Sequence, residues 1–266
     1  MSGFHRQGQY RFLLSRRWLG LLVAAVVVAM GCLALGRWQV DRLAERHDRN
    51  DVLTRNLESA PVAPGELLGV GRGPRERDQY ARVRASGRYD LERQLLVRTR
   101  PFEGQVGFNV LTPLVTDEGP ALLVNRGWLP RGATATDLPD VPDPPPGTVT
   151  VTARLRPSEP ASTTGTPPRG QVTRIDVSTI AETLPYDVYG GYAELTDEDP
   201  APARAPQQLP APEPSEGAHL AYAFQWFLFA GLALGGFVVL SRREAQDRRA
   251  ESAAPEPVGV IESVKG

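Results

Sequence analysis

The residues with the clearest potential for chemistry lie at the start of a long apolar run near the C-terminus. If a helix begins near His219, then Tyr222, Ala223 and Trp226 follow at spacings of three, four and seven residues and share its face. An imidazole can ligate haem iron, and aromatic rings suit a flat apolar macrocycle. The alternative is an interfacial histidine beside the Tyr and Trp residues that collect at membrane boundaries, and spacing alone favours this alternative.

Two uncharged apolar runs, residues 18–36 and 220–240, are each long enough to cross a bilayer as a helix. A cleaved signal or a lipid anchor at Cys32 is the alternative for the first run, but the run continues past Cys32 without a small-residue cleavage site. The sequence therefore predicts an N-terminal tail (1–17), a transmembrane helix (18–36), a β-rich domain with Pro-rich linkers (37–218), a second transmembrane helix (219–240) and a C-terminal tail (241–266).

The arginines predict the orientation, because short loops rich in Lys and Arg stay cytoplasmic. Arginines lie on both sides of the first run and do not decide. The segment before the second run carries only Arg204 among many acids, whereas Arg242, Arg243, Arg248 and Arg249 follow that run. We expect a multi-pass plasma-membrane protein with both termini cytoplasmic and the central domain outside.

Composition excludes several classes of function. Lys265 is the only lysine, and this preference for Arg suggests a high-GC bacterial genome. The net charge of -1 provides no basic field for nucleic acid. The central domain contains no Cys, and its only histidine is His47, close to the first run. A catalytic triad, a zinc site or a copper site is therefore not expected there, and we predict that the protein is not an enzyme.

Side-chain alternation predicts a mostly antiparallel β domain, because apolar and polar residues alternate with the strand period of two. The fold class expected is an α+β membrane protein, with two transmembrane helices flanking a small barrel or sandwich. A capping-box pattern predicts a short helix over 179–184. Proline-rich segments at 139–147, 157–170 and 199–216 are expected to be unstructured. The strands expected are 81–86, 94–100, 106–115, 121–128, 149–155, 171–177 and 188–196.

Short motifs along residues 35–240 resemble, in order, those of the surfeit locus 1 (Surf1) family. The first follows the initial apolar run and is similar to a Gly-x-Trp-Gln-x-x-Arg signature, and the last is the stretch 219–226. The motif residues are Gly36, Trp38, Gln39, Arg42, Arg98, Arg100, Pro101, Gly107, Pro113, Asn125, Arg126, Gly127, Trp128 and His219.

Surf1 proteins assist the assembly of aa3-type haem-copper cytochrome c oxidase, so the resemblance implies a non-enzymatic assembly factor. Its expected partners are the oxidase catalytic subunit, other assembly factors and membrane lipid. Bacterial members are reported to bind haem a, and the implicated histidine corresponds to His219, the expected iron ligand. Tyr222 and Trp226 would then pack on the macrocycle. Arg98, Arg100 and Arg126 are the candidate partners of the propionates, with solvated strand faces as the alternative for these arginines.

For the other motif residues, the alternative to a role in binding haem or a partner is a local structural role. Arg126, Gly127 and Trp128 are typical of a strand end whose glycine allows tight packing and whose tryptophan fills the core. Residues 38–42 are expected to fix how the first helix leaves the membrane. Close helix-helix contact is expected at Gly231, Gly235 and Gly236.

Two rival functions remain open at this point. A purely structural scaffold for respiratory-complex subunits would never touch haem, and would depend on the outer surface around Trp128. An extracytoplasmic enzyme would need carboxylate or tyrosine chemistry, and ranks last.

Overall fold

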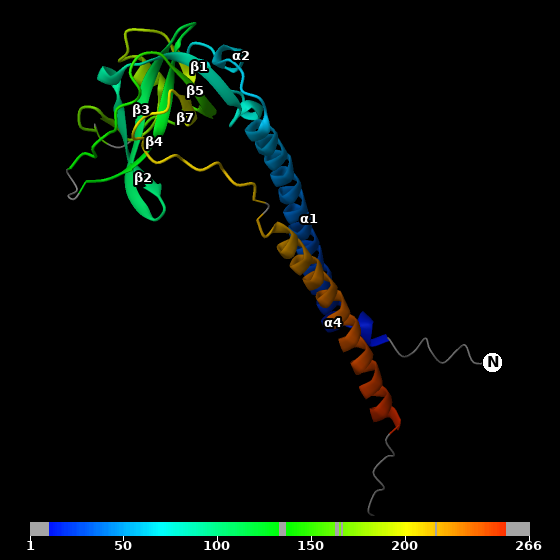
Figure 1. The fold of residues 1–266 in the computed structure, drawn as a ribbon. Helices are drawn as coiled ribbons and strands as arrows, with labels where there is room; N and C mark the ends of the chain where they lie inside the picture. The colour runs from blue at the N-terminus through cyan, green and yellow to red at the C-terminus, as the bar shows by residue number, and fades with distance from the viewer. Residues whose placement is uncertain (1–10, 133–136, 163–164, 166, 216, 254–266) are drawn as a thin grey trace, which may run out of the picture. The chain divides into compact units, whose positions relative to one another are not determined.

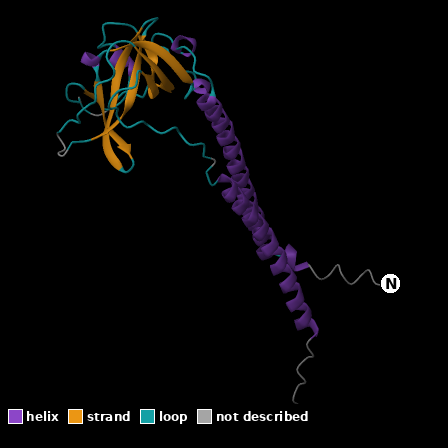
Figure 2. Ribbon diagram, in the orientation of Figure 1, coloured by secondary structure: helices purple, strands orange, loops and turns teal. Residues whose placement is uncertain are grey.

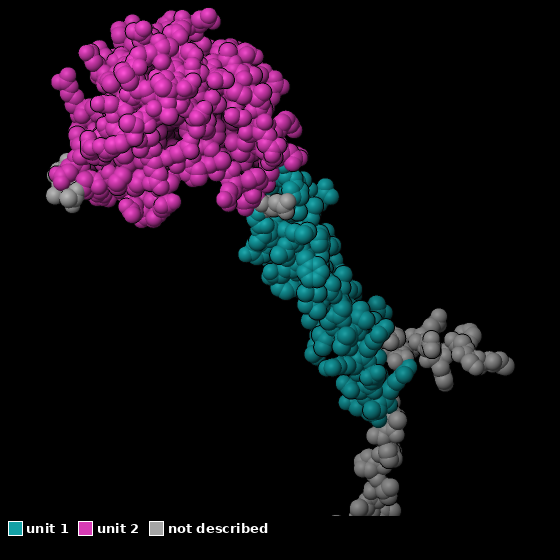
Figure 3. Space-filling model, in the orientation of Figure 1, with its two compact units in different colours: residues 1–47, 216–266 teal, residues 48–215 magenta. Residues whose placement is uncertain are grey.

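The computed structural model describes residues 11–132, 137–162, 165, 167–215 and 217–253, so parts of both predicted tails lie outside the described residues. The chain divides into two compact units (Figure 3). Unit 1 comprises residues 1–47 and 216–266, and unit 2, here called the β domain, comprises residues 48–215.

Two long helices build unit 1: α4 (His219–Ala253) and the first part of α1 (Arg16–Glu58), which is preceded by the 3-10 helix η1 (Arg11–Leu14). Both α1 and α4 are long and apolar enough to cross a membrane. Many of their large apolar side chains are exposed, as expected for helices that face lipid. Among the described residues there are therefore two candidate membrane helices, one on each side of the β domain in sequence.

The two helices of unit 1 run antiparallel and lie side by side (Figure 1). One contact cluster joins the beginning of α1 to the later part of α4, and another joins residues 29–32 of α1 to the third and fourth turns of α4. The first and last described residues of unit 1 therefore lie toward the same end of the helix pair. The clusters contain Phe12, Trp18, Phe237 and Ala245, and Ala29, Cys32, Trp226 and Ala230 respectively.

The described residues of the β domain contain seven strands, which form one sheet in the order β1-β5-β7-β4-β3-β2-β6. Figure 2 shows the strands gathered in this domain, apart from the long helices. Strand β1 also pairs with β3, so that β1, β5, β7, β4 and β3 close into a small barrel. The sequence predicted either a small barrel or a sandwich, and the structure has the barrel. Pairing is antiparallel except for β4 with β7 and β2 with β6. The strands are β1 (Arg82–Tyr89), β2 (Leu95–Phe102), β3 (Gln105–Thr116), β4 (Ala121–Pro130), β5 (Val149–Pro157), β6 (Gln171–Val172) and β7 (Val188–Asp199).

Strand β4 is buried on both faces and carries the motif residues Asn125, Arg126, Gly127 and Trp128. Leu122 and Val124 belong to the cluster between β1, β5 and β7, whereas Leu123 packs on the opposite face with Ile180 of helix α3 (Val177–Ala181). This two-sided burial explains the continuous apolar run of β4, in contrast to the alternation in β1. Short helices complete the domain: α2 (Pro64–Leu67), η2 (Glu76–Asp78) and η3 (Leu91–Arg93).

The predictions for residues 171–184 were wrong in detail. Only Gln171 and Val172 form a strand, and helix α3 covers 177–181 instead of 179–184. The cap is Asp176, whose side chain accepts a hydrogen bond from the backbone N–H of Thr179. Because an Asp cap satisfies the free N–H groups of the first turn, it starts the helix earlier than a Thr179 cap would.

The segments predicted to be unstructured contain no helix in their described parts, but they are attached to the barrel. The carbonyl of Pro142 accepts a hydrogen bond from Arg126 at 2.9 Å. Gln207 exchanges two backbone hydrogen bonds with Trp128, at 2.7 and 2.8 Å. These contacts hold two of the segments, 139–147 and 199–216, against the barrel, although their composition is typical of flexible linkers.

Candidate functional site

His219 lies in the first turn of α4, and its Nδ1 is 2.8 Å from Oε1 of Gln39 on α1. The two residues are 180 positions apart and belong to the last and first motifs of the sequence. His219 and Gln39 are each half-buried. Within the part of the chain that the structure describes, no other side chain hydrogen-bonds to the imidazole. Nε2 is therefore the ring nitrogen that has no side-chain hydrogen-bond partner among these residues.

The predicted face of α4 is partly formed as expected. Ala223 is buried, and Trp226 packs on the cluster around Cys32, so these two residues continue the side of His219 that faces α1. Tyr222 lies at the edge of this face and is 51% exposed. Trp226 is therefore held in a helix contact, whereas the Tyr222 ring is accessible from outside unit 1.

The glycine that permits close helix contact is Gly36 of α1. A Cβ at this position would lie 2.7 Å from the ring of Phe227, which leaves no room for a side chain. The prediction for the glycines of α4 was wrong, because they lie on a face that does not pack on α1. Among the described residues, no atom beyond the helix's own local backbone lies within 4 Å of a Cβ built on Gly231, Gly235 or Gly236.

Trp38 and Arg42 lie on the exposed surface of α1. The Arg42 guanidinium lies 5.6 Å from the centre of the Trp38 ring and forms an ion pair with Glu45 at 2.8 Å. Trp38 is 50% exposed. A role for these residues in setting how the helix leaves a membrane stays a prediction.

The residues around His219 fit a single axial ligand to haem iron. A ligating histidine donates its second ring N–H to an acceptor, and Gln39 supplies that acceptor. In the described ranges, no group of three or more His, Cys, Asp or Glu side chains is arranged to hold a bare metal ion. One imidazole with an outer acceptor is the donor that a haem would need from this site.

Arg126, the predicted propionate partner, is a buried residue of the β domain and is only 3% exposed. Its guanidinium donates to Gln94 at 3.3 Å and to the Pro142 carbonyl at 2.9 Å, and it lies 5.5 Å from the centre of the Tyr89 ring. Burial lowers the pKa of Arg126 below its ordinary value. This enclosed position argues against Arg126 as a propionate partner and favours a structural role.

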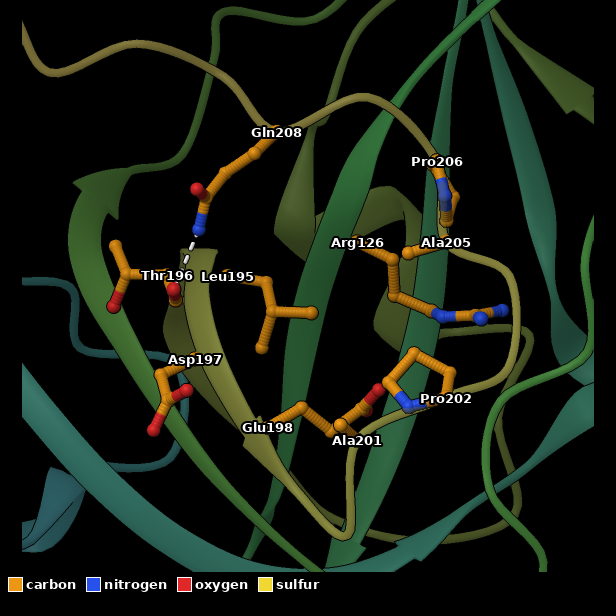
Figure 4. A pocket seen from close by; sticks show the side chains of 10 residues that line it. All are labelled: Arg126, Leu195, Thr196, Asp197, Glu198, Ala201, Pro202, Ala205, Pro206 and Gln208. Atoms are coloured by element: carbon orange, nitrogen blue, oxygen red, sulfur yellow. Dashed lines mark hydrogen bonds between the residues drawn. The ribbon is translucent and has the colours of Figure 1, made fainter.

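A cavity of about 270 Å³ lies beside Arg126, between β7 and the segment 201–208 (Figure 4). Glu198 lines the same cavity, and the side chain of Gln208 donates to the Thr196 carbonyl across it. Both oxygens of the Glu198 carboxylate and Nε of Arg126 are shielded from water and lack hydrogen-bond partners among the described residues. Burial raises the pKa of Glu198, although the charge of Arg126 opposes this shift.

Trp128 fills a core position, as the local interpretation of its motif predicted. It is 4% exposed, stacks on Phe102 at 5.2 Å between ring centres, and donates from Nε1 to the Arg100 carbonyl at 2.8 Å. A Cβ on Gly107 would lie 2.5 Å from the Trp128 ring, so the glycine in that strand makes room for the indole. The Trp128 ring points into the domain, so its side chain contributes little to the outer surface on which the scaffold hypothesis depends.

Four further motif residues lie on strands of the β domain: Asn125, Pro113, Arg98 and Pro101. Asn125 is buried and its Oδ1 accepts from the Gly127 N–H at 3.3 Å. Pro113 is buried in β3 and its carbonyl accepts from the backbone N–H of Asp90. Arg98 is half-buried and Pro101 is exposed, both on β2.

Arg100 forms an ion pair with Glu159 at 2.6 Å, and both side chains are mostly buried. Burial alone would raise the pKa of Glu159, but hydrogen bonds from Arg100 and from the Ile175 N–H lower the pKa below its ordinary value. The pair therefore attaches the segment after β5 to strand β2.

The Arg100–Glu159 pair predicts a loss of stability in acid. A carboxylate with a lowered folded-state pKa stabilises the fold above its unfolded pKa, near 4.5, and this contribution disappears as pH falls through the folded-state value. We expect Glu159→Gln to cost about 1–3 kcal/mol at pH 7 and progressively less toward pH 3. Thermal unfolding followed by circular dichroism measures this difference. Glu92→Gln, at an exposed position, is the control, and an equal cost at both pH values would contradict the prediction.

Sequence reasoning did not find the partners of the motif residues. It assigned Gln39 to the helix exit and did not pair it with His219, and it did not select Glu159 or Glu198. One signal was present for Gln39: Gly36 lies three positions earlier and therefore on the same helix face. A glycine at a helix contact marks the face from which Gln39 reaches α4.

Comparison with known proteins agrees over most of the chain. Residues 26–231 match the sequence model of the SURF1 family. Proteins described as uncharacterized SURF1-like proteins in Mycobacterium bovis and Mycobacterium tuberculosis are 34% identical over 252 residues, covering 92% of this chain and 91% of theirs. Surfeit locus protein 1 of Takifugu rubripes is 31% identical over 135 residues, covering 43% of this chain and 51% of that protein.

Proposed function

Because this chain belongs to the SURF1 family, we propose that it is an assembly factor for aa3-type cytochrome c oxidase that holds haem a through His219. The observation that supports this most directly is the imidazole at the start of α4, hydrogen-bonded at Nδ1 to Gln39 and without a side-chain partner at Nε2 among the described residues. Haem a, when bound, supplies an iron whose axial position a neutral imidazole nitrogen can occupy.

The residues around His219 have separate tasks in this proposal. Gln39 orients the imidazole, and Trp226 holds α4 against α1. Tyr222 offers an exposed aromatic ring on which an apolar macrocycle can lie. Arg126 is left out of the proposed site because its guanidinium is enclosed in the β domain. The protein acts by binding and release, without an enzymatic step.

The proposed location is the plasma membrane, crossed by α1 and α4. Antiparallel packing brings the two described ends of unit 1 to the same end of the helix pair, which supports a two-span topology with both termini on one side. The arginines after residue 240 favour the cytoplasm for that side and place the β domain outside. There the protein would meet the oxidase catalytic subunit, and other assembly factors, without any nucleic-acid partner.

An optical spectrum tests the haem proposal directly. The full-length protein is expressed in a host that makes haem a and purified in detergent, as wild type, His219→Ala and His47→Ala. We expect a stoichiometric haem a spectrum that His219→Ala abolishes, because the axial imidazole is removed. His47→Ala changes an exposed histidine of α1 and is expected to keep the spectrum.

Three outcomes of this experiment are informative. Haem a in the wild type and the His47 variant alone supports the proposal. Haem retained by His219→Ala would remove His219 from the site. A wild-type protein without haem, despite adequate supply, would overturn haem handling and leave a scaffold that binds oxidase subunits.

A further inference from the structure

The contact between His219 and Gln39 also indicates which imidazole nitrogen carries the proton. Oε1 of a glutamine amide is only an acceptor, so at 2.8 Å the Nδ1 of His219 must carry the proton and donate it. A neutral imidazole with its proton on Nδ1 has a lone pair on Nε2. The hydrogen bond therefore selects one of two tautomers.

The helix packing explains why this contact has a fixed register. Gln39 lies one turn beyond Gly36, whose missing side chain accommodates the ring of Phe227. The small residues Ala29 and Cys32 pack against Ala230 on the same side of α1. These contacts set the approach of the two helices, so that Gln39 faces the first turn of α4.

We propose that Gln39 is a positioning residue that holds His219 in the Nδ1–H tautomer and thereby presents the Nε2 lone pair to an iron-porphyrin ligand. This inference rests on the proposed function for its ligand, but the tautomer itself is a property of the protein without haem. Acceptors of this kind orient metal-binding histidines and increase their basicity as ligands.

The first test measures the tautomer in the haem-free, full-length protein in detergent. Nitrogen-15 NMR with labelled histidine distinguishes a protonated from an unprotonated ring nitrogen, and a His219→Ala sample assigns the signals. We expect His219 to be protonated at Nδ1 and unprotonated at Nε2. Gln39→Leu removes the acceptor, and we expect it to move the proton to Nε2, whereas Gln39→Glu keeps an acceptor and is expected to keep the wild-type pattern.

The second test measures binding of haem a to the same proteins by optical titration. Loss of an outer partner of a metal-binding histidine typically costs about 10–100-fold in affinity, and we expect a loss of this size for Gln39→Leu, with recovery in Gln39→Glu. Gln225→Leu makes the same change at an exposed position of α4 and is expected to bind as the wild type does.

The outcomes separate this inference from the proposed function. A wild-type His219 protonated at Nε2, or a Gln39→Leu variant with unchanged tautomer and affinity, would overturn the positioning role while haem binding stands. An Nδ1–H tautomer in a wild-type protein that binds no haem would support the role of Gln39 and overturn the proposed function.

Discussion

Trp128→Ala is expected to destabilise the β domain by about 3–5 kcal/mol, as truncation of a buried tryptophan usually does. The indole is 4% exposed and stacks on Phe102. Its removal opens a cavity beside Phe102 of β2 and over Gly107 of β3, and it also leaves the Arg100 carbonyl without the Nε1–H donor. For a domain of this size, the loss corresponds to a melting temperature lower by roughly 6–20 °C.

Thermal unfolding of the full-length protein in detergent, followed by near-ultraviolet circular dichroism, measures this effect. Trp128→Phe keeps a ring against Phe102 but loses the hydrogen bond, and we expect a much smaller cost. Trp38→Ala removes a half-exposed tryptophan of unit 1 and is the matched control. A Trp128→Ala protein that melts within about 2 °C of the wild type would contradict the assignment of this ring to the core.

This expectation changes how the scaffold hypothesis is tested. A mutation at Trp128 that abolishes oxidase assembly would report an unfolded β domain and would not identify a contact surface. A surface test must use exposed residues, such as Pro101 on β2, whose replacement leaves the core intact.

The strands were the most predictable part of the fold, because their signals are local. Val83 and Ala85 alternate with polar residues, and this period of two reports a strand with one face in the core. The closure of the barrel was not predictable to the same degree. It depends on β1 pairing with β3 across the chain, and no local pattern specifies which strands become neighbours.

The candidate site was predictable in its residue types but not in its geometry. The aromatic spacing after His219 indicated a helix face, yet the partner of His219 lies 180 residues away on α1. The register of two packed helices follows from side-chain shape at contacts such as Gly36 with Phe227, which a single sequence does not report. For Arg126 the sequence offered two roles, a partner for a propionate and a local structural role, and its burial beside Tyr89 favours the second.

Gly127→Ala is expected to cost about 2–6 kcal/mol in the free energy of unfolding, because two penalties add. Gly127 has φ of +135°, a backbone conformation open essentially to glycine, which accounts for about 1–3 kcal/mol. A Cβ at this position would also lie 2.6 Å from the Gln207 carbonyl oxygen, a backbone atom that cannot rotate away. That collision accounts for about another 1–3 kcal/mol.

The collision with the Gln207 carbonyl can be detected locally, because two backbone hydrogen bonds join Gln207 to Trp128, the residue after Gly127. We expect Gly127→Ala to break both bonds and to increase amide hydrogen exchange in residues 201–208, measured by mass spectrometry. Gly104→Ala is the matched control, since Gly104 has φ of +78° but open space around its Cβ. It should show the cost of backbone strain alone, with unchanged exchange in 201–208. Equal exchange in that segment for both variants would mean that Gly127 serves only its own backbone conformation and does not dock the segment that covers Arg126 and Glu198.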